Sequence, residues 1–172
     1  MAPVLSADRA VLGIQLPIQA QSRNFVEPWE AEAGAVDLAR IATAADRAGL
    51  GYVAVCDHVA VPVAQVEAMG AEWWDTVATL GWLAGLTERT LLVSHVAVPA
   101  YRHPLAVDKA FATLDVVSGG RAVLGVGAGH VEGEFAALGV PFEERGRLLD
   151  EAIDAVRACF ASETPSHRGE RW

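Results

Sequence analysis

Four apolar segments that favour β-strands alternate along this chain with four amphipathic segments that favour α-helices. The strand-like segments are Val11–Gln19, Gly51–His58, Thr90–Val98 and Arg121–Gly129. The helix-like segments are 35–50, 73–87, 105–120 and 143–162. Strands that are apolar on both faces, each followed by a helix, are typical of a parallel sheet covered by helices. The sequence therefore predicts an α/β fold made of four βα units.

Two architectures fit such a pattern: an open doubly wound sheet, and part of a (β/α)8 barrel. A complete barrel needs about 250 residues, and this chain has 172, enough for about half. Residues are 52% hydrophobic and 20% charged, which is typical of a globular chain. We predict a single domain over 1–172 that ends in a polar, turn-rich tail over 163–172. The last helix is expected to bury Leu148, Ile153, Val156 and Phe160.

The charge balance narrows the range of partners. The net charge is -9 and no basic run is present, so we expect neither nucleic acid nor a membrane surface as a partner, but a small-molecule substrate. No apolar stretch approaches the roughly 20 residues that span a bilayer, and the first ten residues do not resemble a signal peptide. Cys56 and Cys159 lie outside any CxxC motif, which favours reduced thiols and a cytoplasmic location.

Ionisable residues follow the predicted strands, where both architectures place their functional sites. Asp57 and His58 come directly after the second strand. His58 has the residue type for acid–base chemistry near neutral pH; alternatively, Asp57 caps the next segment and His58 is merely solvated. Arg102, in the stretch YRHP, either faces an anion or belongs to a helix entry that Pro104 fixes.

The remaining histidines are weaker evidence for a functional site. His95 interrupts an apolar strand, where a histidine is more often a structural residue than a catalytic one. His58, His95, His103 and His130 all lie near strand ends, but no pair has HxH or HxxxH spacing. The sequence therefore predicts no metal site.

The glycine-rich segment RAVLGVGAGHVEGEF, residues 121–135, is a candidate for a dinucleotide-binding turn. The GxGxxG fingerprint would need a third glycine at His130 or at Glu132, and neither position has one. The segment is also the fourth strand-to-helix turn of the chain, whereas the fingerprint normally lies at the first. The acids after the glycines would also repel a pyrophosphate. The glycines instead provide space for the close approach of a flat ring or of an adjacent strand.

These motifs resemble the luciferase-like monooxygenase superfamily, in particular its flavin- and F420-dependent oxidoreductases. The resemblance covers most of the chain and includes GIQLP, AGLGYVAVCDHV, and the ordered run RHP, TLD, SGGR, LGVGAG, EF, ERG and LDE. It implies the first half of a (β/α)8 barrel with the cofactor ring across its C-terminal mouth. It also implies hydride transfer between that ring and a small organic substrate. The Asp-His pair and the motif GVGAG are most similar to those of the F420-dependent members. This similarity favours coenzyme F420, a deazaflavin, with FMN as the alternative cofactor.

The resemblance also assigns residues. Asp57 and His58 match the family's Asp-His pair, which contacts the ring, so we expect both to be catalytic and to bind the cofactor. The histidine assists proton transfer in some members. His95–Val96 matches a non-proline cis peptide bond that backs the ring, with Ser94–His95 as the other candidate bond. The segment Gly127–Gly129 matches the lip of the pocket. Two residues depart from the family: His95, where many relatives have a small residue, and His130, where many have Trp or Glu.

The length of the chain bears on the function that we expect. In relatives the second half of the barrel grips the cofactor's phosphates, so this chain is expected to be a fragment, a truncated product or a true half-barrel. The first and fourth strands would then have unpaired edges, which favours a homo-oligomer or pairing through those edges. Three tryptophans lie in or beside the loops after the first two strands and either wall an apolar pocket or pack on the barrel rim: Trp29, Trp73 and Trp74. Two alternatives remain: a non-catalytic half-barrel without the phosphate site, and a nucleotide-binding open sheet.

Overall fold

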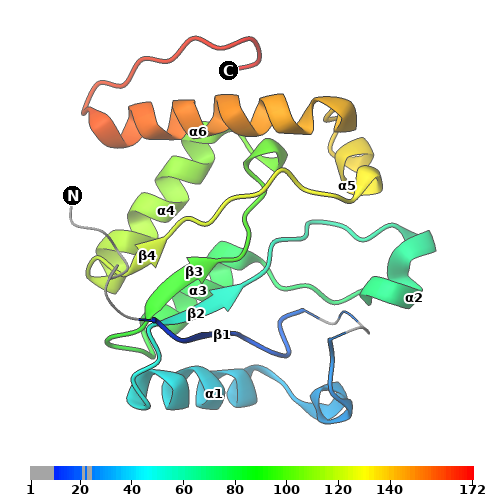
Figure 1. Ribbon diagram of the computed structural model, residues 1–172, viewed down its shortest axis with the longest axis vertical. Coiled ribbons are helices and arrows are strands. Elements are labelled where there is room, and N and C mark those ends of the chain that lie inside the picture. Colours follow the sequence, from blue (N-terminus) through cyan, green and yellow to red (C-terminus); the bar gives the residue numbers. More distant parts are fainter. Residues whose placement is uncertain (1–9, 21, 23–24) are drawn as a thin grey trace.

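The strand-like segments form one parallel sheet. The computed structural model describes residues 10–20, 22 and 25–172. The strands are β1 (Gly13–Gln15), β2 (Tyr52–Val55), β3 (Leu91–Ser94) and β4 (Ala122–Val123). Within the described residues these four strands form a single sheet in the order β1-β2-β3-β4, with every neighbouring pair parallel (Figure 1). The predicted parallel α/β fold is confirmed.

Each predicted helix is present, close to its predicted bounds. The α-helices are α1 (Ala35–Arg47), α2 (Val66–Met69), α3 (Thr76–Ala84), α4 (Pro104–Ser118), α5 (Glu132–Ala137) and α6 (Arg145–Ala161). Short 3-10 helices lie in the connections: η1 (Pro28–Glu32), η2 (Val63–Gln65), η3 (Pro99–Tyr101) and η4 (Phe142–Glu144). The sequence did not predict α2 and α5, because helices this short show no clear periodicity. None of the helices in the described part of the chain is long and apolar enough to cross a membrane.

Helix α4 shows how the sequence sets the ends of an element. Pro104 occupies its first position, where the missing N–H has no helical acceptor to serve. At the other end Gly119 adopts a left-handed conformation with φ of 71°, which terminates the helix. The sequence predicted both ends of this helix correctly.

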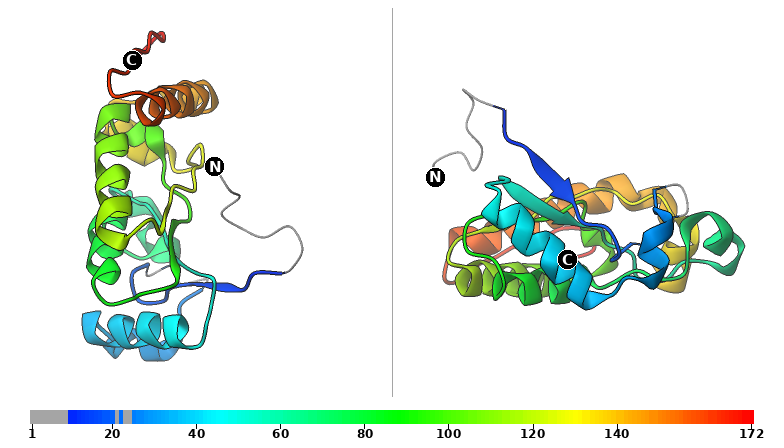
Figure 2. Two further views of the ribbon diagram at one scale, coloured as in Figure 1. Left: turned by 90° about the vertical axis from the view of Figure 1, so that its left-hand side faces the viewer. Right: turned by 90° about the horizontal axis from the view of Figure 1, so that it is seen from below.

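The winding of the chain decides between the two predicted architectures. Helices α1, α3 and α4 lie on one face of the sheet (Figure 2). In a doubly wound sheet the strand order reverses at a switch point and helices cover both faces. Here the strand order is sequential and, among the described residues, no helix covers the second face. The fold is therefore the first half of a (β/α)8 barrel, and the open sheet is excluded.

The strand register separates a helix-facing layer from a second layer that no helix of the described residues covers. Ile14, Val53, Leu92 and Ala122 are aligned across the sheet and pack in one core cluster with buried residues of the helices, such as Leu38 of α1. Because side chains alternate along a strand, the next set of aligned residues faces the other side. That set, which we call the inner row, is Gln15, Ala54, Val93 and Val123.

The fourth strand is shorter than the sequence predicted. Strand β4 ends at Val123, although the apolar pattern continues to Gly129. Beyond Val123, the chain rejoins β3 through a single bridge between Val126 and Ala97, where the N–H of Ala97 donates to the oxygen of Gly125 at 2.8 Å. The ladder is interrupted because the β3 segment between Ser94 and Ala97 leaves the regular strand path.

The expected buried face of α6 is partly wrong. Leu148 and Val156 are buried and Ile153 is partly buried, but Phe160 is 56% exposed. Helix α6 packs on α4 and η3. Phe160 lies in the last turn of α6, next to the tail, where the described residues do not cover it. The contacting face includes Ala152 and Ala155, because small residues let the helices approach closely.

The tail over 163–172 folds back across α6 (Figure 1). The backbone N–H groups of Arg171 and Trp172 donate to Glu151 Oε1 at 2.9 and 2.7 Å. The indole of Trp172 packs against a second buried cluster that includes Phe135 and Leu148. This cluster ties α5, α6 and the tail to the end of β3, where the candidate site lies.

Candidate functional site at the mouth of the half-barrel

A hollow of about 650 Å³ lies where the carboxyl ends of the strands meet. We call it the mouth hollow. Residues that the sequence analysis selected and that line it are Asp57, His58, His95, Val96, Gly127, Gly129 and His130. Ser94 does not line it: this residue is fully buried, and its hydroxyl donates to the oxygen of Gly125 at 2.9 Å. The fold thus brings most of the predicted site together and leaves Ser94 within the sheet.

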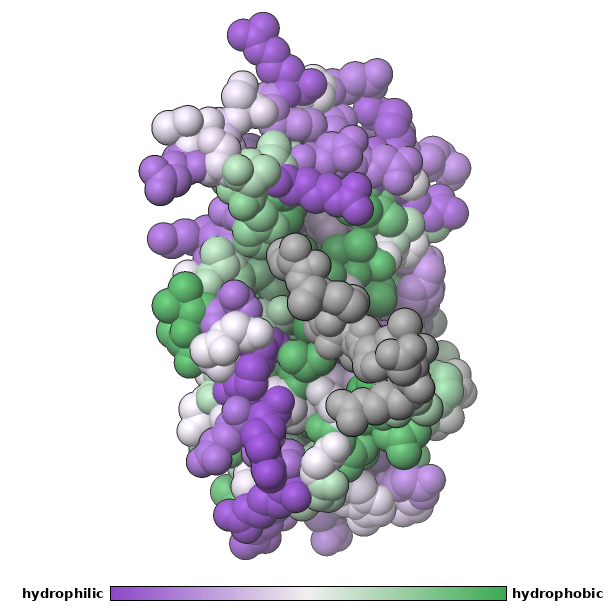
Figure 3. Space-filling model, turned by 60° about the vertical axis from the view of Figure 1, so that its left-hand side comes forward, coloured by the Kyte–Doolittle hydropathy of each residue, from purple (hydrophilic) through white to green (hydrophobic). Residues whose placement is uncertain are grey.

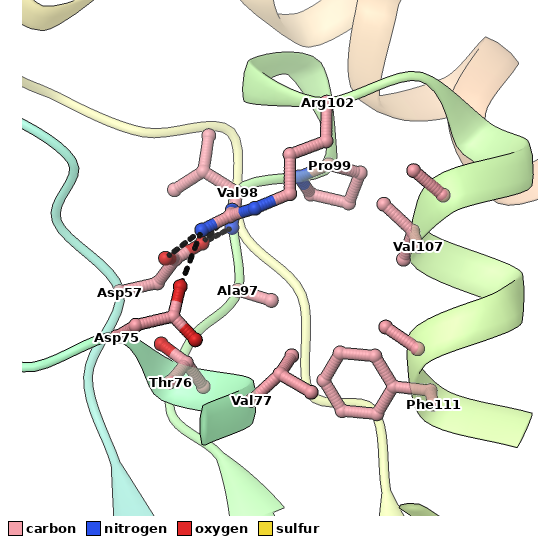
Figure 4. Close-up of a pocket in the computed structure, with 12 residues that line it drawn as sticks. Asp57, Asp75, Thr76, Val77, Ala97, Val98, Pro99, Arg102, Val107 and Phe111 are labelled. Atoms are coloured by element: carbon pink, nitrogen blue, oxygen red, sulfur yellow. Dashed lines mark hydrogen bonds and ion pairs between the residues drawn. The ribbon is translucent and has the colours of Figure 1, made fainter. Parts of the chain in front are cut away.

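Asp57 is held by an arginine. Arg102 Nη1 and Nη2 lie 2.7 and 2.8 Å from the two Asp57 oxygens, and the N–H of Val98 donates to Asp57 Oδ2 at 3.0 Å. Asp75 Oδ2 lies 3.7 Å from Arg102 (Figure 4). Burial lowers the pKa of Arg102, but the hydrogen bond and the charge of Asp57 outweigh it, so the net pKa is raised. The anion that Arg102 faces is therefore Asp57, and this ion pair anchors the end of β3 to the end of β2.

His58 is held by a carboxylate that is distant in sequence. Its Nδ1 lies 2.7 Å from Oε2 of Glu134, in α5. The N–H groups of Val59 and Ala60 donate to the other oxygen of Glu134, at 2.6 and 3.1 Å, and the Tyr101 hydroxyl donates to Oε2 at 3.1 Å. Glu134 is fully buried. A buried carboxylate with four donors is a rigid anchor rather than a solvated acid.

The anchor determines the charge on Glu134 and the tautomer of His58. Burial, the largest influence, raises the pKa of Glu134, but the hydrogen bonds from His58, Ala60 and Val59 together lower it below its usual value. Burial, followed by the charge of Glu134, raises the pKa of Tyr101, which keeps the phenol protonated as a donor. A charged Glu134 favours the His58 tautomer with hydrogen on Nδ1, and Nε2 then has a free lone pair.

Two rings lie beside His58. The ring of Trp73 lies edge-on with a centroid separation of 4.2 Å, and the ring of His130 lies 5.8 Å away, also edge-on. The His58 side chain is 11% exposed, so little of it remains open to solvent. Trp73 thus walls the mouth hollow. Trp29 and Trp74 do not line it: Trp29 is 50% exposed, and Trp74 packs against the helix-facing core cluster.

The cis peptide bond lies where the resemblance implied. His95–Val96 is a non-proline cis bond. The other candidate, Ser94–His95, is therefore excluded. His95 and Val96 are both exposed on the wall of the mouth hollow.

The glycines after β4 leave space for neighbouring protein groups. A Cβ at Gly127 would lie 2.5 Å from Cγ2 of Val96, and a Cβ at Gly129 would lie 2.9 Å from the Phe135 ring. Gly129 also has φ of 81°, which favours glycine. Of the two predicted uses of this space, close approach of the adjacent strand is the one that these distances support.

His103 and the two thiols have structural surroundings. His103 Nδ1 accepts a hydrogen bond from the N–H of Leu105 at 3.2 Å, as the cap of α4. Cys56 and Cys159 are free thiols. Burial raises the pKa of Cys56, which disfavours a reactive thiolate. In the described part of the chain, no group of three His, Cys, Asp or Glu residues is placed to hold a metal ion.

Glu134 and Tyr101 are site residues that the sequence did not predict. Both lie within strand-end segments, but no local spacing links Glu134 to His58, which lies 76 positions earlier. The signal that could have found Glu134 is its place in the first turn of α5, after the glycines. Because that short helix showed no periodicity, its direction was not predictable.

The lining of the mouth hollow fits a flat heteroaromatic ring. Its volume falls within the range of about 300–1,000 Å³ that is typical of small-molecule sites. Apolar and aromatic groups such as Leu16, Trp73 and Val96 form its walls. The amide side chain of Gln15, which also lines the hollow, can bond ring oxygens and nitrogens.

Comparisons with known proteins agree with this architecture. Among sequences, the chain is 34% identical over 144 residues to an F420-dependent glucose-6-phosphate dehydrogenase of Amycolatopsis mediterranei, covering 80% of this chain and 41% of that protein. Among structures, monooxygenase RslO1 from Streptomyces bottropensis is 29% identical, with a TM-score of 0.76, and the match covers 93% of this chain and 46% of that one.

A third relative carries a flavin. The oxygenating constituent of 3,6-diketocamphane monooxygenase from the CAM plasmid of Pseudomonas putida, in complex with FMN, has a TM-score of 0.70 at 15% identity, over 95% of this chain and 42% of that one. At this identity the match shows the fold alone. The chain thus spans less than half the length of these relatives. The model of the luciferase-like monooxygenase family matches residues 14–172, so the chain belongs to that family.

Proposed function

We propose that this protein is an oxidoreductase that transfers hydride between a deazaflavin or flavin ring and a small organic substrate. The observation that carries the proposal is the His58–Glu134 pair at the mouth of the half-barrel, with Nδ1 and Oε2 2.7 Å apart. A histidine whose far nitrogen is held by a buried carboxylate is oriented and tuned for proton transfer. A merely solvated His58 would not need that anchor.

In this proposal His58 is the catalytic acid–base residue. Nε2 takes the proton from a substrate hydroxyl when the substrate is oxidised, and returns it in the reverse direction. Glu134 acts through His58 as a positioning residue: it holds hydrogen on Nδ1 and stabilises the imidazolium that forms. Asp57, held by Arg102, positions the ends of β2 and β3 around the pocket.

The cofactor that we propose is coenzyme F420, with FMN as the alternative. The F420-dependent relative supports the first, and the FMN-bound relative of the same fold supports the second. When bound, the ring would accept or supply the hydride. Val96, Gly127 and Trp73 would lie against it, with Gln15 at its polar edge. We place this chemistry in the cytoplasm because Cys56 and Cys159 are free thiols, which reducing compartments maintain.

Titration of the chain with F420 and with FMN tests the proposal. We expect both rings to bind in the mouth hollow, with F420 bound more tightly, and Trp73 fluorescence to be quenched. The variant His58→Gln should retain cofactor binding and lose roughly 100-fold in turnover of an alcohol substrate. The matched control is His103→Gln, whose imidazole caps α4 outside the hollow.

Two results would contradict the proposal. One is the absence of binding of either ring at saturating concentration, which would favour the non-catalytic half-barrel. The other is equal turnover by His58→Gln and by the unmodified protein, which would remove His58 from the chemistry.

A further inference from the structure

The carboxylates around the mouth hollow are all engaged by donors of the protein itself. Glu30, which is 4% exposed, accepts hydrogen bonds from the N–H of Ile18 at 2.7 Å and from the N–H of Glu27 at 2.9 Å. Asp57 is paired with Arg102, and Glu134 is saturated by four donors. None of these three carboxylates offers a free oxygen to a ligand in the hollow.

Two imidazoles, in contrast, face the hollow from adjacent strand ends. His95 follows β3 and His130 follows the glycines after β4, and both are exposed and line the hollow. The bridge between Ala97 and Val126 places these two strand ends side by side. Within the described residues neither imidazole has a hydrogen-bond partner, whereas His58 is held by Glu134.

We propose that His95 and His130 select a substrate that carries a carboxylate or another anionic oxygen. This inference rests on the proposed function and names the substrate class of the same site. Ring nitrogens that carry hydrogen donate to an anionic oxygen, and a protonated imidazole adds a charge-assisted bond, which is stronger than a neutral one. The hollow is thus rich in donors although the chain as a whole has a net charge of -9.

The other ionisable residues around the two imidazoles leave the role of donor to them. Glu30, Cys56, Asp57, His58 and Tyr101 also line the hollow, with Glu134 bonded to His58 and the exposed Glu132 two positions after His130. The carboxylates among them are acceptors, so they do not compete with His95 and His130 for an anionic oxygen.

Three small probes of nearly equal shape and different charge test the inference: benzoate, benzamide and benzamidine. We expect calorimetric titration of the chain without cofactor to show benzoate binding about tenfold more tightly than benzamide near pH 6, with benzamidine the weakest. On adding benzoate, the imidazole resonances of His95 and His130 should shift, which gives a readout that needs no variant.

Substitutions of the two histidines test whether the preference for benzoate depends on them. We expect His95→Gln and His130→Gln each to reduce the preference for benzoate, and the double variant to remove it. The control His103→Gln should keep it, because that imidazole lies outside the hollow. Equal affinity for benzoate and benzamide near pH 6, or a preference that survives in the double variant, would overturn the inference.

The oxygens of the cofactor ring could also accept hydrogen bonds from His95 and His130, in place of a substrate carboxylate. Riboflavin, which has the flavin ring without phosphate, tests for this second role. If the double variant loses riboflavin affinity while benzoate and benzamide bind equally to the unmodified chain, the histidines serve the ring and the substrate inference is wrong. Loss of F420 binding with an intact benzoate preference would contradict only the proposed function.

Discussion

At the scale of single residues, Glu134 links the folding of this protein to its chemistry. Its carboxylate is fully buried and accepts four hydrogen bonds, one of them from His58. A buried charge of this kind is tolerated only because every lone pair has a donor. The same bonds that stabilise the charge orient the imidazole, so a defect here should alter stability and chemistry together.

We expect Glu134 to stabilise the folded chain above about pH 4.5 and to lose this effect in acid. The pKa of Glu134 is lowered in the folded state, because its hydrogen bonds outweigh its burial. A group with a lowered folded pKa contributes stability that is present above its unfolded pKa and is lost as the pH falls through the folded value. Urea unfolding of the protein and of Glu134→Gln, at neutral pH and in acid, measures this contribution.

Glu134→Gln should have a free energy of unfolding about 1–3 kcal/mol below that of the unmodified protein at neutral pH. This difference should shrink in acid. Glu132→Gln, at an exposed position of the same helix, is the matched control and should change stability little. A difference between the protein and Glu134→Gln that grows as the pH falls would contradict the prediction.

At the scale of elements, Arg121 joins the ends of α3 and α4 to the sheet. Its guanidinium donates to the carbonyl oxygens of Ala84 and Thr87 at 3.0 Å each, and to Ser118 O at 2.7 Å. It also donates to the hydroxyl of Thr87 at 2.8 Å and to Thr90 O at 3.1 Å. Carbonyls at a helix C-terminus lack partners within the helix, so one side chain with several donors in a fixed plane satisfies both helix ends.

Arg121→Lys is therefore expected to destabilise the chain by about 2–3 kcal/mol, because an ammonium cannot reach carbonyls on two helices at once. Arg157→Lys, at an exposed position on α6, is the matched control and should be neutral. Chemical unfolding monitored by circular dichroism measures both. If the two variants were equally stable, the five donor contacts of Arg121 would not contribute to stability.

At the scale of the whole molecule, the helices of the described residues cover one face of the sheet and leave the other face without a helix. Within the described residues β1 and β4 each pair on one side only, and the inner row faces away from the helices. Figure 3 shows hydrophobic residues across the middle of one side of the molecule, between hydrophilic regions. Unpaired parallel edges beside an apolar face favour association with another chain.

We expect the chain to self-associate through these edges in a concentration-dependent manner, measured by sedimentation velocity. Val123→Lys places a charge in the inner row of an edge strand and should shift the distribution towards monomer. Val116→Lys, on the 80% exposed outer surface of α4, is the control and should leave the distribution unchanged. A monomeric chain at all concentrations, or equal effects of the two variants, would rule out pairing through the edges.

The sequence by itself determined the four strands, the four longer helices and the edge of the sheet at which the site lies. Continuous apolar runs such as Gly51–His58 predict buried parallel strands, and Pro104 and Gly119 mark the ends of α4, because these signals act within one turn or one strand. The GxGxxG count also excluded a dinucleotide turn from local spacing alone. The resemblance implied the cis bond at His95–Val96, which is present.

Only the tertiary structure decided what each charged group faces. Asp57 meets Arg102 across 45 positions and His58 meets Glu134 across 76, and no local pattern encodes such distances. Phe160 was expected inside and is exposed, because burial depends on which neighbour covers a helix turn. Local propensity acts through nearby backbone, whereas ion pairs and burial depend on how distant segments pack, and this is why the His58 anchor became visible only in the fold.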